Sequence, residues 1–209
     1  MSIMLKTLFL LALTLPSAAA AEKGWVSLFN GKDFTGWKVN ENTGTFTIRE
    51  GAIVAHGPRS HCFYVGDFMN HTFRNFELKV DIKTENNSNG GVYILTGFQE
   101  SGWPAKGFEV QVNNTFVKDP RKTASLYAVK DNLDKVADDD KWFTEHIIVK
   151  DSKVTIKVDD KVVTEWTQPA DWAGTKDFPE RRINPGTIAL QGHDPGSTVY
   201  YKNIRIKPM

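Results

Sequence analysis

The sequence predicts an all-β protein, built as a two-sheet antiparallel sandwich of the jelly-roll type. Three features of the chain indicate this fold class. Hydrophobic residues recur at every second position, turn-forming residues separate these runs at short intervals, and no long stretch keeps the 3.6-residue period of a helix. Many short alternating runs of this kind are typical of sandwiches and jelly rolls.

Strands are predicted where apolar and polar residues alternate. In residues 76–83, Phe76, Leu78, Val80 and Ile82 alternate with charged residues, which indicates a strand with one buried and one solvated face. The same alternation predicts strands at residues 108–112, 146–150, 154–158, 162–163, 187–191 and 199–206. The runs between residues 146 and 163 are joined by aspartate-containing turns, as in a series of hairpins.

Turn chemistry marks the breaks between these runs. It is present at Asn30-Gly31, Glu50-Gly51, residues 86–91 and Asp194-Pro195-Gly196. Short segments near Trp103-Pro104 and at residues 169–172 are expected to form single helical turns. Because no linker or internal repeat divides the chain, we expect a single β-sandwich domain over residues 22–209.

Residues 1–21 have the pattern of a cleaved signal peptide. Lys6 lies in a positively charged start, an apolar core runs through residues 5–15, and small residues at Ala19 and Ala21 fit the signal-peptidase pattern. The apolar stretch is about half of the ~20 residues that span a bilayer. We therefore expect a periplasmic or secreted protein that is free of the membrane once the signal is removed.

Charge and cysteine content narrow the class of partner. The formal net charge of +1 provides neither a basic stripe for nucleic acid nor a polybasic patch for anionic lipid, so a neutral partner is expected. Cys62 is the single cysteine, which excludes an internal disulfide, and its apolar surroundings predict a buried, inert thiol.

No motif in the sequence calls for a cofactor. His56, His61 and His71 match no zinc-binding spacing and are expected in loops. The run of aspartates at residues 138–140 lacks the glycine and the spaced glutamate of a calcium loop. We predict no cofactor and no metal ligand, and the sequence leaves open a calcium ion or a similar divalent cation.

Several predicted strands carry functional side chains on their polar faces. The candidates for a shared site are Glu109, Gln111, Gln191, His193, Tyr93, Tyr127, Asp81 and Lys83. Together these carboxylate, amide, imidazole, phenol and ammonium groups could hold a polyhydroxylated ligand and move protons. Trp103, in a Gly-Trp-Pro loop, is the best platform for stacking on a sugar ring. For any one strand, an ordinary solvated face would show the same alternation.

A set of motifs along the chain resembles the 3-keto-disaccharide hydrolase family. They are Leu28-Phe-Asn-Gly-Lys-Asp-Phe-Thr-Gly-Trp37, Asn75-Phe-Glu-Leu78, Asn89-Gly-Gly-Val-Tyr-Ile94, Gly107-Phe-Glu-Val-Gln-Val112, Thr123-Ala-Ser-Leu-Tyr127, Gly186-Thr-Ile-Ala-Leu-Gln-Gly-His193 and Tyr201-Lys-Asn-Ile-Arg-Ile206. The resemblance implies a concanavalin A-like jelly roll, exported in bacteria. It also implies an enzyme acting on an oligosaccharide or glycoside already oxidised at C3 of the sugar.

By position, the resemblance implies roles for specific residues. Glu109 and Gln111 fill the Glu-x-Gln pair of the family, and Gln191 and His193 fill its Gln-x-His pair. Glu109 or His193 is then the proton-transfer group, the glutamines orient hydroxyls, and Lys83 stabilises an enolate. The chain departs from the family at three places, with Gly90 for a serine, Leu95 for an arginine, and Asn113-Asn114 where an aspartate is common.

Three functions are compatible with these residues. The first is cleavage of 3-keto-glycosides by elimination and hydration, and the second is a non-catalytic carbohydrate-binding sandwich that uses the same face. The third is an ordinary retaining glycosidase, which needs a second carboxylate about 5–5.5 Å from Glu109, such as one supplied across strands by Asp81. Because sandwich folds serve lectins and hydrolases alike, the fold class alone does not choose among them.

Overall fold

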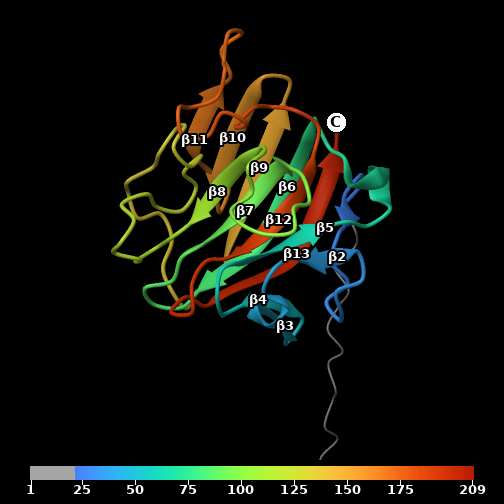
Figure 1. Cartoon of the computed structure of the whole chain (residues 1–209), viewed down its shortest axis with the longest axis vertical. Helices are drawn as coiled ribbons and strands as arrows, with labels where there is room; N and C mark the ends of the chain where they lie inside the picture. The colour runs from blue at the N-terminus through green and yellow to red at the C-terminus, as the bar shows by residue number, and fades with distance from the viewer. Residues whose placement is uncertain (1–21) are drawn as a thin grey trace, which may run out of the picture.

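The computed structural model describes residues 22–209 as two antiparallel sheets packed face to face (Figure 1). The predicted all-β sandwich is confirmed. The larger sheet has eight strands, in the order β11-β10-β9-β6-β13-β4-β3 with β1 beside β13, and the smaller has the order β2-β5-β12-β7-β8. The predicted signal peptide, residues 1–21, lies outside the described residues.

The strands of the larger sheet are β1 (Val26–Ser27), β3 (Phe46–Arg49), β4 (Ala52–Ala55), β6 (Phe76–Thr84), β9 (Phe143–Lys150), β10 (Lys153–Val158), β11 (Lys161–Thr167) and β13 (Val199–Pro208). Those of the smaller sheet are β2 (Trp37–Val39), β5 (Ser60–Tyr64), β7 (Gly90–Thr96), β8 (Phe108–Val112) and β12 (Thr187–Gly192). The runs predicted by alternation all form strands. The strands β1 to β5 were not predicted, because β1 to β4 have only two to four residues and every residue of β5 is buried, which leaves it without a polar face to alternate.

The burial pattern of the eight-stranded sheet matches the alternation in its sequence. In β6, every second residue from Phe76 is fully buried against the other sheet, and the charged residues between them face outward. The neighbouring strands β9 and β10 bury Ile147, Val149, Val154 and Ile156 in the same layer. The resulting core lies between the two sheets, because only there can both apolar faces leave water.

The five-stranded sheet is buried on both faces, which corrects the prediction of a half-exposed strand at residues 108–112. All residues of β5, β7, β8 and β12 are buried. One face packs on the core, and long connections cover the other. The segment after β8 pairs with it, because Tyr127 donates its backbone N–H to the carbonyl of Glu109 at 3.0 Å. The polar row on β8 therefore lines an enclosed space.

Two other expectations differ from the structure. The single helical turns predicted near Trp103-Pro104 and at residues 169–172 form bends and turns instead, and the short 3-10 helices are η1 (Thr43–Thr45) and η2 (Phe68–His71). Gly90 and Gly91, predicted in a turn, are the first residues of β7. None of the helical segments in the described part of the chain has the length and apolar character needed to cross a membrane.

Candidate active site

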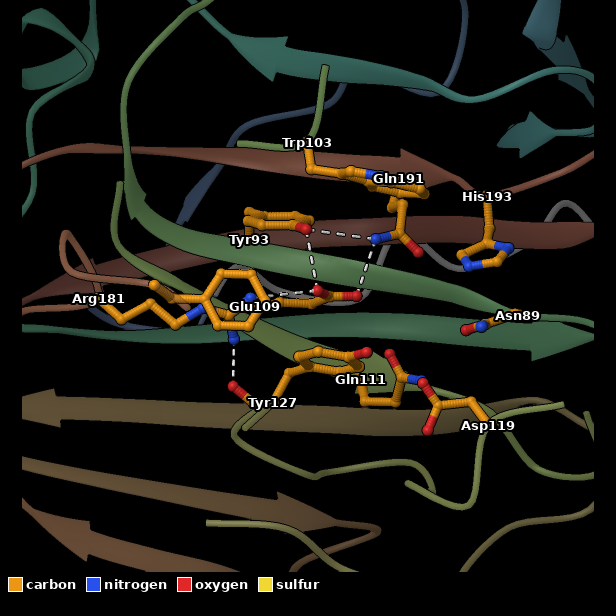
Figure 2. Close-up of a pocket in the computed structure, with 11 residues that line it drawn as sticks. Asn89, Tyr93, Trp103, Glu109, Gln111, Asp119, Tyr127, Arg181, Gln191 and His193 are labelled. Carbon is orange, nitrogen blue, oxygen red and sulfur yellow. Dashed lines mark hydrogen bonds and ion pairs between the residues drawn. The ribbon is translucent and has the colours of Figure 1, made fainter. Parts of the chain in front are cut away.

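A pocket opens on the outer face of the five-stranded sheet, and strand register determines its floor (Figure 2). Gly91 of β7 pairs with Gln191 of β12 on one side and with Gln111 of β8 on the other. In the next row, Tyr93 lies opposite Glu109. Because Gly91 has no side chain, the floor is open there, and a Cβ atom would lie 3.1 Å from Oε1 of Glu109.

Glu109 lies at the centre of a hydrogen-bond network (Figure 2). Tyr93 donates its hydroxyl to Oε2 at 2.9 Å, and Gln191 donates Nε2 to Oε1 at 2.8 Å. Nη2 of Arg181 is 3.8 Å from Oε2. Burial raises the pKa of Glu109, against the opposing effects of Arg181, Gln191 and Tyr93. The result is a carboxylate that is oriented through both oxygens and is a stronger base than an exposed glutamate.

Arg181 is a residue of the site that sequence reasoning missed. It comes from the irregular segment between β11 and β12, where no periodic pattern marks it. Its guanidinium donates to the carbonyl of Tyr127 and lies over the ring of Phe178, 3.8 Å from the centroid. The resemblance places an arginine at Leu95, but Leu95 has φ of +56° and its side chain lies in the core. Arg181 supplies a guanidinium from another segment.

Arg181 is expected to hold down the pKa of Glu109. In an Arg181→Met variant that pKa should rise further, because a buried carboxylate loses the guanidinium beside it. The titration can be followed by 13C NMR of labelled glutamate carboxyl groups. The exposed Arg74→Met variant is the matched control and should leave the Glu109 titration in place. An unchanged pKa in the Arg181 variant would contradict the assigned contact.

His193 lies in the same pocket, beside Asn89 (Figure 2). Its Nδ1 hydrogen-bonds to Oδ2 of Asp194 at 2.7 Å. Burial opposes ionisation of Asp194, but hydrogen bonds from His193, Ser197 and the Gly196 N–H outweigh it and lower the pKa of Asp194. Because Nδ1 is engaged by a carboxylate, Nε2 is the nitrogen available to give or take a proton.

Two glutamine side chains have unused hydrogen-bonding capacity in the pocket. Nε2 and Oε1 of Gln111 and Oε1 of Gln191 are buried without a partner among residues 22–209. Buried polar groups are normally paired, so these atoms are free to bind water or the polar groups of a ligand. An amide offers donors and an acceptor together, which suits the hydroxyl groups of a sugar.

The structure brings together seven of the nine residues predicted for the site. Six of them are Glu109, Gln111, Gln191, His193, Tyr93 and Trp103, and the seventh, Tyr127, lines the pocket from a turn rather than from a strand. Trp103 is in a loop, as predicted, and its ring centroid lies 5.3 Å from that of His193. The pocket also contains four residues that were not predicted, namely Asn89, Asp119, Phe178 and Arg181.

Asp81 and Lys83 are corrections to the predicted site. Both lie on β6 in the other sheet, on the face that points away from the core. Asp81 accepts hydrogen bonds from Thr144 and Asn203, and Lys83 lies over the ring of Tyr200. Alternation shows that both side chains point away from the core, but it does not show to which sheet the strand belongs. Asp81 therefore cannot serve as the second carboxylate of a retaining glycosidase with Glu109.

Asn113 has a structural role at the edge of the site. Its Nδ2 donates to the carbonyls of Phe116, Asp119 and Arg121 at 2.8–3.3 Å, and its Oδ1 accepts from the N–H of Phe116 at 2.8 Å. These bonds hold the loop that places Asp119 in the pocket. An aspartate at this position could only accept hydrogen bonds. Asparagine fits because the position needs a donor as well as an acceptor.

The Asn113→Ala variant is expected to lose about 2–4 kcal/mol of folding free energy, because several buried backbone groups lose their partner at once. Urea unfolding at neutral pH measures this loss. Asn184 is exposed, so the Asn184→Ala variant is the matched control and should unfold like the native protein. Equal stability of the two variants would show that the loop does not depend on Asn113.

We assign no residue of this site to metal binding or to thiol chemistry. Within residues 22–209, no group of three or more His, Cys, Asp or Glu side chains is placed to hold a metal ion. Cys62 is buried, and burial raises the pKa of its thiol, in agreement with the predicted inert cysteine. The sequence left a divalent cation open, and among residues 22–209 none is assigned to bind one.

Comparison with known proteins identifies the family. A domain family described as 3-keto-α-glucoside-1,2-lyase-like matches residues 24–207. The chain belongs to this family. The match spans both sheets, and the resemblance inferred from the sequence motifs is confirmed.

Two similar proteins support this family assignment. It is 27% identical to a 3-keto-disaccharide hydrolase of Bacteroides thetaiotaomicron over 231 residues, covering 88% of this chain and 78% of the relative. A structure from Parabacteroides distasonis, assigned as a glycosyl hydrolase, is 25% identical with a TM-score of 0.74 and covers 89% of this chain and 94% of its own.

A more distant structure shows the concanavalin A-like fold alone. The Bacillus licheniformis β-glucanase has a TM-score of 0.58 at 12% identity, and the alignment covers 88% of this chain and 97% of the glucanase.

Proposed function

We propose that this protein is an exported enzyme that cleaves 3-keto-glycosides by elimination followed by hydration. One observation carries the proposal. Two groups able to transfer protons, Glu109 and the His193–Asp194 pair, lie in one pocket with the unpartnered amide of Gln111 and the unpartnered Oε1 of Gln191. Membership of the family and the names of the relatives support a carbohydrate substrate, and residues 1–21 support export to the periplasm or the medium.

The reaction follows from the acidity that a C3 ketone gives to the C2 proton. A base takes that proton, the electrons move into the C1–C2 bond by way of the C3 enolate, and the C1–O bond breaks. The leaving oxygen takes a proton, which gives an enone and a free alcohol or sugar. Water then adds, with OH going to C1 and H to C2, so the net change is hydrolysis.

The residues of the pocket suit these steps. We assign Glu109 as the base, because its carboxylate is oriented through both oxygens and burial raises its pKa. We assign His193 as the acid for the leaving oxygen, with Nδ1 held by Asp194. Gln111 donates Nε2 to the enolate oxygen, the role that the resemblance gave to Lys83. A donor aimed at the atom where charge develops is the usual means of lowering such a barrier.

A direct test follows the C2 proton. The purified protein is incubated in D2O with a 3-keto-glucoside and with its unoxidised parent. Release of the alcohol from the keto compound alone, with deuterium at C2 of the freed sugar, is the expected result. Release without deuterium at C2 would indicate direct hydrolysis and contradict the elimination.

If His193 is the acid, its contribution to the rate should depend on how much the leaving group needs a proton. A His193→Asn variant is expected to slow release of a methanol leaving group by about 10²–10⁴-fold, because methoxide needs a proton as it departs. Release of 4-nitrophenol, which leaves readily as an anion, should slow much less. His71 is exposed, and the His71→Asn variant is the control. Equal losses for both leaving groups would exclude His193 as the acid.

A second candidate function is a non-catalytic sugar-binding module. The unpartnered amide atoms of Gln111 and Gln191 and the Trp103 platform favour it, since both suit recognition without bond cleavage. The same incubation separates the two functions. If the keto and parent compounds both bind and both remain intact, the protein is a binding module for these sugars.

A further inference from the structure

His61 is a buried histidine that the proposed chemistry does not use. It lies on β5, directly opposite Gln191 of β12, so it continues the polar row of the pocket floor to the other side of Gln191 from Glu109. The sequence-based expectation of a loop histidine is wrong here. Its side chain has no exposed surface, and neither ring nitrogen has a hydrogen-bond partner among residues 22–209.

The surroundings of His61 are aromatic. Its ring centroid lies 5.3 Å from that of Tyr93, 5.6 Å from that of Trp103 and 6.2 Å from that of Phe63. Across the strand pairing it faces Gln191, whose Oε1 is also unpartnered, and the Glu41–Arg59 ion pair and His193 lie near enough to act on its pKa. An imidazole in such a place is unfavourable unless something else satisfies its donor and its acceptor.

Trp103 packs edge-on against His61 and belongs to the loop between β7 and β8, which has several hydrogen bonds within itself. Within the loop, the Gln99 side chain bonds to the carbonyls of Ser101 and Trp103 and to the N–H of Ala105. Two long hydrogen bonds join the loop to the β2–β5 region, from Gly102 N–H to Oε1 of Glu41 at 3.2 Å and from the Asn40 amide to the Gln99 carbonyl at 3.4 Å, and the Arg59 guanidinium lies 5.3 Å from the Trp103 ring centroid. Lifting the loop would break these contacts and those of the Trp103 ring with His61 and His193, and Trp103 is already 43% exposed.

We propose that His61 and Gln191 form a second sugar subsite, which opens when the Trp103 loop lifts and takes the ring attached to the reacting 3-keto sugar. The subsite takes its substrate class from the proposed function. It adds that the substrate carries a second sugar ring. The reacting ring lies over Gly91 between Gln191 and Gln111. The second ring lies toward β5, on the side where Trp103 and His193 are 5.3 Å apart.

The chemistry of this subsite suits a sugar diol. Burial lowers the pKa of His61 to about 3, so the ring is neutral and offers one N–H donor and one acceptor nitrogen. Gln191 adds a second acceptor through Oε1. Two adjacent hydroxyl groups can donate to and accept from such a set, while the rings of Trp103 and Tyr93 contact the C–H faces of the sugar.

The test measures binding of sugars that the enzyme does not turn over, so it is independent of catalysis. Calorimetric affinities are compared for cellobiose and maltose against methyl β- and α-glucoside. In the native protein at least one disaccharide should bind more tightly than its methyl glucoside. In a His61→Phe variant that preference should fall about tenfold or more, as expected for lost hydrogen bonds. The exposed His71→Phe variant is the control and should keep the preference.

Two results would overturn the subsite. One is a native protein that binds neither disaccharide better than its methyl glucoside, and the other is a folded His61→Phe variant that keeps the preference. If that variant does not fold, 15N NMR of the native histidine rings decides, since the bound disaccharide must shift the His61 nitrogens. Turnover of the 3-keto-glucoside is measured separately. Disaccharide preference without turnover would reject the proposed reaction and leave the subsite in place.

Discussion

The Glu109→Gln variant is expected to lose about 10²–10⁴-fold in kcat/KM for a 3-keto-glycoside, the usual contribution of a positioned general base. The change keeps the size of the side chain but removes the group that takes the C2 proton. In the native site Tyr93 and Gln191 each donate to one oxygen of Glu109, and Arg181 lies 3.8 Å from Oε2. The variant can keep only part of this network, because its amide nitrogen is a donor.

Two measurements show whether this loss comes from chemistry. Initial rates give kcat/KM, and exchange of the C2 proton of the keto substrate with D2O reports proton removal by itself. Both should fall together if Glu109 is the base. The exposed Glu180→Gln variant, next to Arg181 in the chain, is the matched control and should keep both rates. Exchange that stays at the native rate in the Glu109→Gln variant would assign the base to another residue.

The second large effect concerns Glu145 in the core between the sheets. On β9 this residue has the same parity as Phe143, Ile147 and Val149 and has no exposed surface. Neither carboxyl oxygen has a hydrogen-bond partner among residues 22–209. Burial raises the pKa of Glu145 well above its ordinary value of 4.5, and the nearby Ala124 backbone opposes this only in part. The folded protein therefore keeps this carboxyl protonated at pH values where the unfolded chain has released the proton.

The stability of the native protein should consequently fall as pH rises. The effect of Glu145 begins near the unfolded pKa of about 4.5 and grows by about 1.4 kcal/mol per pH unit, until the pH reaches the raised folded pKa. A Glu145→Gln variant cannot ionise and loses this dependence. We expect the variant to resemble the native protein near pH 4.5 and to be more stable than it at pH 8.

Urea unfolding of both proteins from pH 4.5 to pH 8 measures the difference, in which the other titrating groups cancel. The exposed Glu180→Gln variant controls for the loss of one carboxylate at the surface. Parallel stability curves for the native protein and the Glu145→Gln variant would show that the carboxyl is not buried as the structure places it.

The all-β fold and much of the site could be predicted from the sequence, because both depend on local geometry. In an extended strand successive side chains point to opposite faces, so Glu109 and Gln111 had to share a face opposite to Phe108, Val110 and Val112. Gln191 and His193 were placed on one face by the same parity, and the family motifs gave both of them a role. The loop position of Trp103 followed from its glycine and proline neighbours.

Strand pairing and loop packing decided the rest. Alternation places Asp81 and Lys83 on a polar face, but the pairing of β6 with β9 and β13 puts that face on the far side of the sandwich from Glu109. Arg181 and His61 reach the site through contacts between segments that are far apart in the chain. Such contacts depend on which strands pair and how connections fold over them, and no local period records either. The sequence by itself therefore determined the direction in which each strand's side chains point, and the tertiary structure decided which of them meet.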